Sequence, residues 1–169
     1  MSKHYGYISF MKNPRISDES KADNVSLDEQ RRILEAKTKG GFTYVYSEAD
    51  ASTGHVRSSS TISRPAFDIL ISTLQKGDVV HIYSWFCLII GSQMQRMSID
   101  ICNTLAKIHD AGASVCFVKE QISTTTPQGK LTITNLIASA QYDYDVSVSS
   151  GQNDNNTVAV KACSGGNHC

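Results

Sequence analysis

Short apolar runs rich in β-branched and aromatic residues alternate with helix-like segments along most of the chain. Residues 5–10, 42–46, 79–83 and 113–118 have the composition of β-strands. A segment with apolar residues at helical spacing follows each of them. Strands that alternate with helices form a mostly parallel sheet with helices on both faces. The sequence therefore predicts an α/β fold of three layers.

Local signals place the ends of the expected helices. Ser26 is a candidate N-cap with Glu29 three residues later, which is the spacing of a capping box, and glycines 40–41 would end that helix. Pro65 suits the first turn of a second helix. A long last helix is expected to begin near Lys130. Residues 1–148 are predicted to form one domain, and 149–169 a flexible polar tail without a DNA-binding domain.

The charge, the apolar content and the cysteines of the chain exclude only a few classes of protein. The 169 residues contain 16 Lys and Arg against 16 Asp and Glu, so a net positive charge gives no argument for nucleic-acid binding. The sequence contains no apolar run long enough to span a membrane and no signal-peptide pattern, so we expect a cytoplasmic protein. Five cysteines with irregular spacing fit neither a disulfide framework nor a zinc site. We expect no metal and no cofactor.

Several segments, in order, resemble the catalytic domain of the resolvase/invertase family of serine recombinases. The S-L-x-x-Q helix start corresponds to residues 26–30, the D-x-x-S-G pattern to residues 50–54, and R-P-x-F to Arg64 through Phe67. The strand entry G-D-x-V corresponds to residues 77–80, and the family's last loop and long helix resemble the chain from Thr124 onward. The resemblance implies a resolvase-like three-layer fold with a long C-terminal helix.

The same resemblance implies a metal-free reaction in which a serine attacks a DNA phosphate while arginines neutralise the transition state. The family's Y-x-R-x-S strand reads Tyr7-Ile8-Ser9-Phe10-Met11 here, and its D-R-L-x-R segment reads Phe86-Cys87-Leu88-Ile89-Ile90. We therefore predict that most of the chemistry has been replaced. The altered positions are Ser9, Met11, Ser63, Phe86, Cys87 and Ile90, and Arg64 is retained.

The replaced positions leave two alternatives open. The apolar side chains Met11, Phe86, Cys87 and Ile90 either fold inward and fill the old cleft or form a surface for a protein partner. Ser9 projects to the same side of the strand as Met11 and is an alternative nucleophile that would act with Arg64. Arg64 either binds an anion or pairs with a carboxylate such as Glu48 or Asp50.

The family also uses its last helix to form dimers and synaptic tetramers. The corresponding apolar residues predict a homodimer or tetramer interface, with covering of the sheet as the alternative; they are Leu131, Leu136, Ile137, Ala140 and Tyr144. Acidic residues such as Asp143 and Asp145 predict weak or absent DNA binding by this helix. The sequence thus favours a catalytically inactive interaction or regulatory protein, which pairs with itself or with an active recombinase. The alternative is a divergent active recombinase or DNA nuclease that uses Ser9 with Arg64.

Overall fold

The computed structural model describes residues 1–9, 25–38, 41–48, 64–89 and 97–163, with only the backbone for 151–163. Within these residues the strands form one sheet in the order β2-β1-β3-β4-β5. Strands β1 (His4–Ile8), β2 (Tyr44–Ser47), β3 (Val79–Ile82) and β4 (Ser114–Phe117) are parallel. The short strand β5 (Ile122–Ser123) runs antiparallel to β4.

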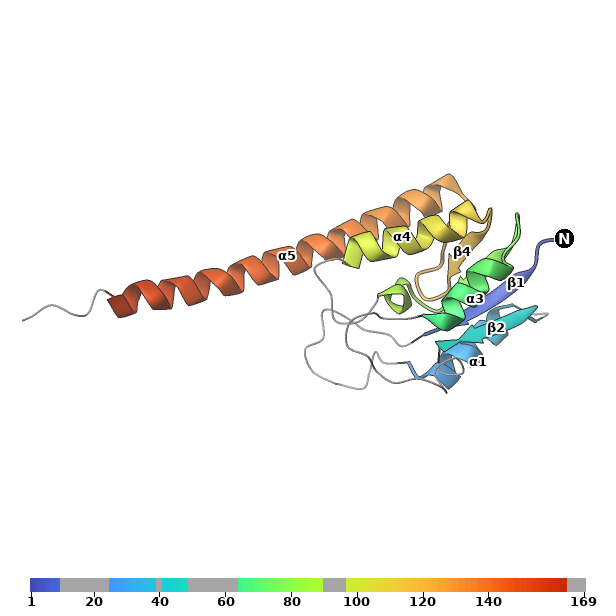
Figure 1. Cartoon of the computed structure of the whole chain (residues 1–169), viewed down its shortest axis with the longest axis horizontal. Helices are drawn as coiled ribbons and strands as arrows, with labels where there is room; N and C mark the ends of the chain where they lie inside the picture. Colours follow the sequence, from blue (N-terminus) through green and yellow to red (C-terminus); the bar gives the residue numbers. More distant parts are fainter. Residues whose placement is uncertain (10–24, 39–40, 49–63, 90–96, 164–169) are drawn as a thin grey trace, which may run out of the picture.

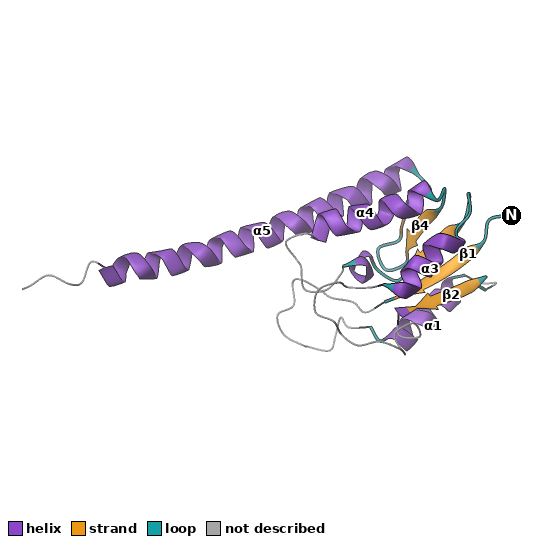
Figure 2. Ribbon diagram, viewed as in Figure 1, coloured by secondary structure: helices purple, strands orange, loops and turns teal. Residues whose placement is uncertain are grey.

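Helices cover both faces of this sheet (Figures 1 and 2). Helix α1 (Leu27–Lys37) packs on one face, where its Leu34 meets Ile8 and Val118. Helices α3 (Pro65–Thr73), α4 (Met97–Asp110) and α5 (Pro127–Cys163) share the larger core on the opposite face. The predicted three-layer α/β fold with a mostly parallel sheet is confirmed.

The side-chain alternation of β1 accounts for the two cores. Tyr5 and Tyr7 point into the larger core, whereas Ile8 points toward α1. Tyr7 lies beside Ile82 of β3, which in turn lies beside Phe117 of β4. All three are fully buried. This row of large side chains holds the ends of the strands, and the loops that follow them, in a fixed arrangement.

Helix α1 begins where the capping signal predicts. The Ser26 hydroxyl accepts a hydrogen bond from the backbone N–H of Glu29 at 3.2 Å. The Glu29 carboxylate is bound by Arg32 of the same helix at 2.6 and 2.9 Å. The hydrogen bond from the Glu29 N–H to the Ser26 hydroxyl, one of the two bonds of the predicted capping box, is therefore confirmed. The Glu29 side chain forms an ion pair with Arg32 within the same helix.

Helix α5 is longer than the sequence predicts. It begins at Pro127 and ends at Cys163, which at 1.5 Å per residue is roughly 55 Å. The helix continues past residue 148, where we expected the ordered domain to end, and extends well beyond α4 (Figure 1). A helix nucleated on a packed segment can propagate one residue at a time through polar sequence, because the costly nucleation step has already been made. Among the described residues no helix has the length and apolar content to cross a membrane.

Gly129 allows the first turn of α5 to approach β5 closely. A β-carbon at this buried position would collide with the backbone carbonyl oxygen of Ser123. The backbone N–H of Gly129 donates to the Thr126 hydroxyl at 3.1 Å, which helps to start the helix. The glycine therefore determines how closely α5 packs against the sheet.

Candidate functional site

The carboxyl ends of the parallel strands bring together the chemically active side chains of the described chain. Ser9 follows β1, Glu48 follows β2, Ser84 follows β3 and Glu120 lies shortly after β4. Open parallel sheets bind their ligands at this edge. Arg64, the residue just before α3, reaches the same edge from the face that carries the larger core.

Tyr7, Glu48 and Arg64 form one hydrogen-bonded cluster. The Tyr7 hydroxyl donates to Glu48 Oε1 at 2.8 Å. The same hydroxyl oxygen accepts from Arg64 Nε at 3.0 Å and from Nη2 at 2.9 Å. Burial raises the pKa of Tyr7 above its usual value, so the hydroxyl keeps its proton and remains a donor to Glu48. Two of the five guanidinium donors are therefore engaged by one phenol.

Glu48 also caps α3 from outside the helix. Arg64 occupies the N-cap position and provides no side-chain cap, and Pro65 has no backbone N–H to donate. Glu48 Oε2 accepts from the N–H of Ala66 at 3.3 Å, and Oε1 accepts from that of Phe67 at 3.0 Å. A carboxylate at a helix N-terminus satisfies the free N–H groups and interacts favourably with the helix dipole.

The Arg64 guanidinium stacks over aromatic rings. Its central carbon lies 4.5 Å from the ring centre of Phe67 and 5.2 Å from that of Tyr7. The two rings meet edge to face at 5.5 Å. The buried atom Nη1 has no hydrogen-bond partner within the described structure. The hydrogen-bonding capacity of Nη1 is therefore unused within the described residues, although burial keeps this atom away from solvent.

Gln30 connects α1 to this edge of the sheet. Its side-chain amide donates to the carbonyl oxygens of Ser9 at 3.1 Å and Val25 at 3.2 Å. Its own carbonyl oxygen accepts from the Cys87 thiol at 3.7 Å. Gln30 and Cys87 are both buried, and burial raises the pKa of Cys87 to about 12. Cys87 is therefore a neutral core thiol.

The segment after β3 turns into the 3-10 helix η1 (Trp85–Leu88), which the sequence did not predict. Ser84 caps it by accepting from the N–H of Phe86 at 3.4 Å, and the Ser84 hydroxyl donates to Glu120 Oε1 at 2.5 Å. Burial raises the pKa of Glu120, and its buried Oε2 has no partner within the described residues. Trp85 and Phe86 stack with ring centres 4.0 Å apart.

Comparison with known proteins identifies the fold and the family. The sequence profile described as "Resolvase, N terminal domain" matches residues 14–165. The chain belongs to the resolvase N-terminal domain family. A comparison with curated protein sequences gives no significant match.

Two solved structures share the fold of this resolvase-family chain at low sequence identity. The N-terminal catalytic domain of TP901-1 integrase is 18% identical, with a TM-score of 0.54; the match covers 86% of this chain and 99% of that one. A resolvase family site-specific recombinase from Streptococcus pneumoniae is 14% identical, with a TM-score of 0.55; the match covers 94% of this chain and 99% of that one. Both support the resolvase-like arrangement of sheet and helices.

The structure brings together part of the predicted site. Arg64 and Phe86 are half-buried, Ser9 is half-buried beside Gln30, and Cys87 is buried. Met11, Ser63 and Ile90 lie outside the described residues, as does Asp50. From the sequence we expected Glu48 only as a partner for Arg64, and we did not predict a role for Ser84 or Glu120. These three residues could have been found from their position in the sequence, because each lies within a few residues of the end of a parallel strand.

The five residues of the predicted interface on α5 differ in how far they are exposed. Ile137 and Ala140 are buried in the chain's own core, and Tyr144 is half-buried. Leu131 and Leu136 are exposed, at 55% and 39%. Within this chain the first group therefore covers the sheet, which was the alternative to an interface role, and the second group remains accessible.

Replacement of Glu48 by Gln should destabilise the fold. The amide nitrogen is a donor and would face one of the N–H or O–H donors that the carboxylate now accepts from. We expect the free energy of unfolding to fall by about 1–3 kcal/mol, measured by urea denaturation. The matched control is Asp68→Asn, since Asp68 is an exposed acid in the first turn of the same helix and should change stability by less than about 0.5 kcal/mol. Equal effects of the two substitutions would contradict the capping role of Glu48.

Cys87 should resist alkylation in the native protein. With a pKa of about 12, only about one thiol in ten thousand is ionised at pH 8, and the thiolate is the reactive form. Cys102 of α4 is exposed and serves as the internal control. We expect iodoacetamide to modify Cys102 at least about 100-fold faster than Cys87, as measured by peptide mass spectrometry. The difference should vanish in urea, and equal native rates would refute the buried environment.

Proposed function

We propose that this resolvase-family protein does not cleave DNA and acts as an oligomerising interaction or regulatory subunit in DNA recombination. The observation that carries the proposal is the environment of Cys87. The residue stands where the resemblance expects an arginine, and it is a buried thiol bonded to Gln30. A neutral thiol supplies none of the positive charge that phosphoryl transfer without a metal requires.

The retained arginine supports the same conclusion. Arg64 donates twice to the Tyr7 hydroxyl and stacks on Phe67, so much of its binding capacity stabilises the start of α3. At the nucleophile position the chain has Met11, whose thioether has no proton to lose and cannot form the phosphoserine link. Removal of one preorganised charge donor typically costs about 2.7–4 kcal/mol of barrier, and several donors are replaced here.

The exposed side of α5 supports self-association. Leu131, Tyr142 and Val146 are 55%, 68% and 44% exposed. Tyr142 lies about three turns after Leu131, so these side chains share the face opposite the buried Ile137 and Ala140. An apolar stripe along a helix that extends beyond its own domain favours pairing with a second helix. We propose a dimer through this face, and Leu136 lies outside it, on the side of the helix next to Ala140.

Pairing with an active recombinase is a concrete form of the regulatory role. A subunit that keeps the assembly surface and lacks the chemistry would enter a mixed oligomer and leave some of its DNA strands uncleaved. The expected partner is therefore either a second copy of this chain or a catalytically competent family member.

A second candidate function is a divergent recombinase or nuclease that uses Ser9 with Arg64. It is favoured by one observation: Arg64 Nη1 makes no hydrogen bond within the described residues, so a rearrangement that exposed this buried atom would provide a donor for a phosphate oxygen. Ser9 lies at the same edge of the sheet, directly after β1. The two functions differ in whether a covalent protein–DNA link can form.

A cleavage assay on supercoiled plasmid separates the two functions. We expect the purified chain to leave plasmid that carries candidate recombination sites intact, and no protein–DNA adduct to survive SDS. The positive control is an active resolvase-family enzyme with its own site. An SDS-resistant adduct that is lost on Ser9→Ala, in a variant with unchanged stability, would overturn the proposal and establish the enzyme.

A further inference from the structure

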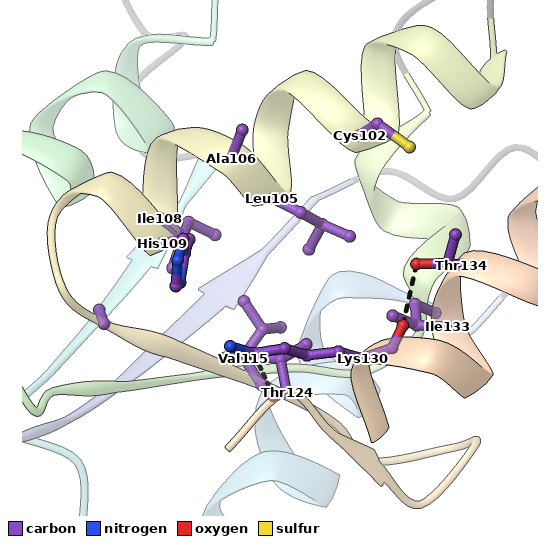
Figure 3. Close-up of a pocket in the computed structure, with 11 residues that line it drawn as sticks. Cys102, Leu105, Ala106, Ile108, His109, Val115, Thr124, Lys130, Ile133 and Thr134 are labelled. Carbon is purple, nitrogen blue, oxygen red and sulfur yellow. Dashed lines mark hydrogen bonds between the residues drawn. The ribbon is translucent and has the colours of Figure 1, made fainter. Parts of the chain in front are cut away.

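A cavity of about 310 Å³ lies between α4, α5 and the sheet, away from the strand ends that form the candidate site (Figure 3). Its interior is apolar and is formed by Leu105 and Ile108 of α4, Val115 of β4 and Ile133 of α5. Ile108, Val115 and Ile133 are almost completely buried. The volume lies at the lower end of the range for small-molecule sites and accommodates about ten water-sized groups.

The polar groups of the cavity are of two kinds. The hydroxyls of Thr124 and Thr134 are bonded to backbone atoms: Thr124 accepts from the N–H of Val115 at 2.8 Å, and Thr134 donates to the carbonyl of Lys130 at 2.9 Å. The ammonium of Lys130 and the imidazole of His109 belong to exposed residues that also line the cavity. No Asp or Glu is among the described lining residues. The cavity thus combines an apolar interior with a basic opening.

We propose that this cavity binds a small amphipathic anion, a medium-chain or aromatic carboxylate of about ten non-hydrogen atoms. The apolar part would fill the space between Leu105 and Ile133 and restore packing contacts that an empty cavity lacks. The carboxylate would meet the Lys130 ammonium, with His109 as a second donor. Such a ligand contacts both α4 and α5 and therefore ties the long helix to the domain. The inference does not depend on the proposed function.

Octanoate is a suitable probe, because its eight carbons and two oxygens match the expected size. We expect a titration at pH 7, followed by amide chemical shifts, to give saturable changes confined to the residues around the cavity, with a dissociation constant in the millimolar range. Octylamine carries the opposite charge on the same chain and should bind at least about fivefold more weakly.

Three variants make the test specific. Lys130→Gln should weaken octanoate binding at least about fivefold, whereas Lys107→Gln should leave it unchanged, since Lys107 lies on α4 outside the cavity lining. Ala106→Phe places a ring at the rim of the cavity from an exposed position and should weaken binding without unfolding the protein. Amide spectra of each variant verify the fold.

The proposal is overturned if octanoate gives no saturable shift up to 20 times the expected dissociation constant, or if octylamine binds as well as octanoate. Unchanged affinity in Lys130→Gln would place the anion elsewhere and would also overturn it. If saturating octanoate returns a self-associated sample to the monomer mass in light scattering, a second copy fills the cavity and the carboxylate assignment is wrong.

Discussion

The Glu48 carboxylate, held between the Tyr7 hydroxyl and the first N–H groups of α3, is the interaction on which the candidate site depends. It joins β1, β2 and α3 at one point. Without it, the start of α3 would have neither an N-cap side chain nor a partner for its free N–H groups. Arg64 then completes the cluster by donating to the same phenol, so the geometry of the arginine follows from a structural contact.

This coupling gives Arg64 a structural role that does not require a reaction, in keeping with the proposed absence of DNA cleavage. The cation–π contact with Phe67 and the bonds to Tyr7 stabilise the junction between strand and helix, which is a sufficient physical reason to retain Arg64. Around it, Cys87 and Gln30 form a neutral buried contact, and Ser84 donates to a buried Glu120. These groups fix the loops at the strand ends and contribute little positive charge. The proposed dimer face lies along α5, and the proposed ligand cavity lies between α5 and α4.

The fold was largely predictable because its signals are local and periodic. Apolar runs rich in aromatic and β-branched residues at 5–10 and 79–83 predicted the strands, and Ser26 and Pro65 predicted helix starts that the structure confirms. The strand β5 has only two residues and η1 has four, which is too short for periodicity to show.

The site was less predictable, because Glu48 and Glu120 act through contacts with residues far away in sequence. Which residues of α5 face the core was also not predictable, since Leu131 and Ile137 are equally apolar and only packing distinguishes them.

We propose that the exposed face of α5 mediates self-association and that the recombination chemistry is lost. The most direct test is the solution mass by light scattering over a concentration series, for the chain and for a Leu131→Ser, Tyr142→Ser variant that leaves the buried stripe intact. Self-association through this face predicts a mass that rises from that of the 18.5 kDa chain toward about twice that value, with the variant remaining monomeric. A monomer at every concentration, or a dimer that the double substitution leaves unchanged, would contradict it.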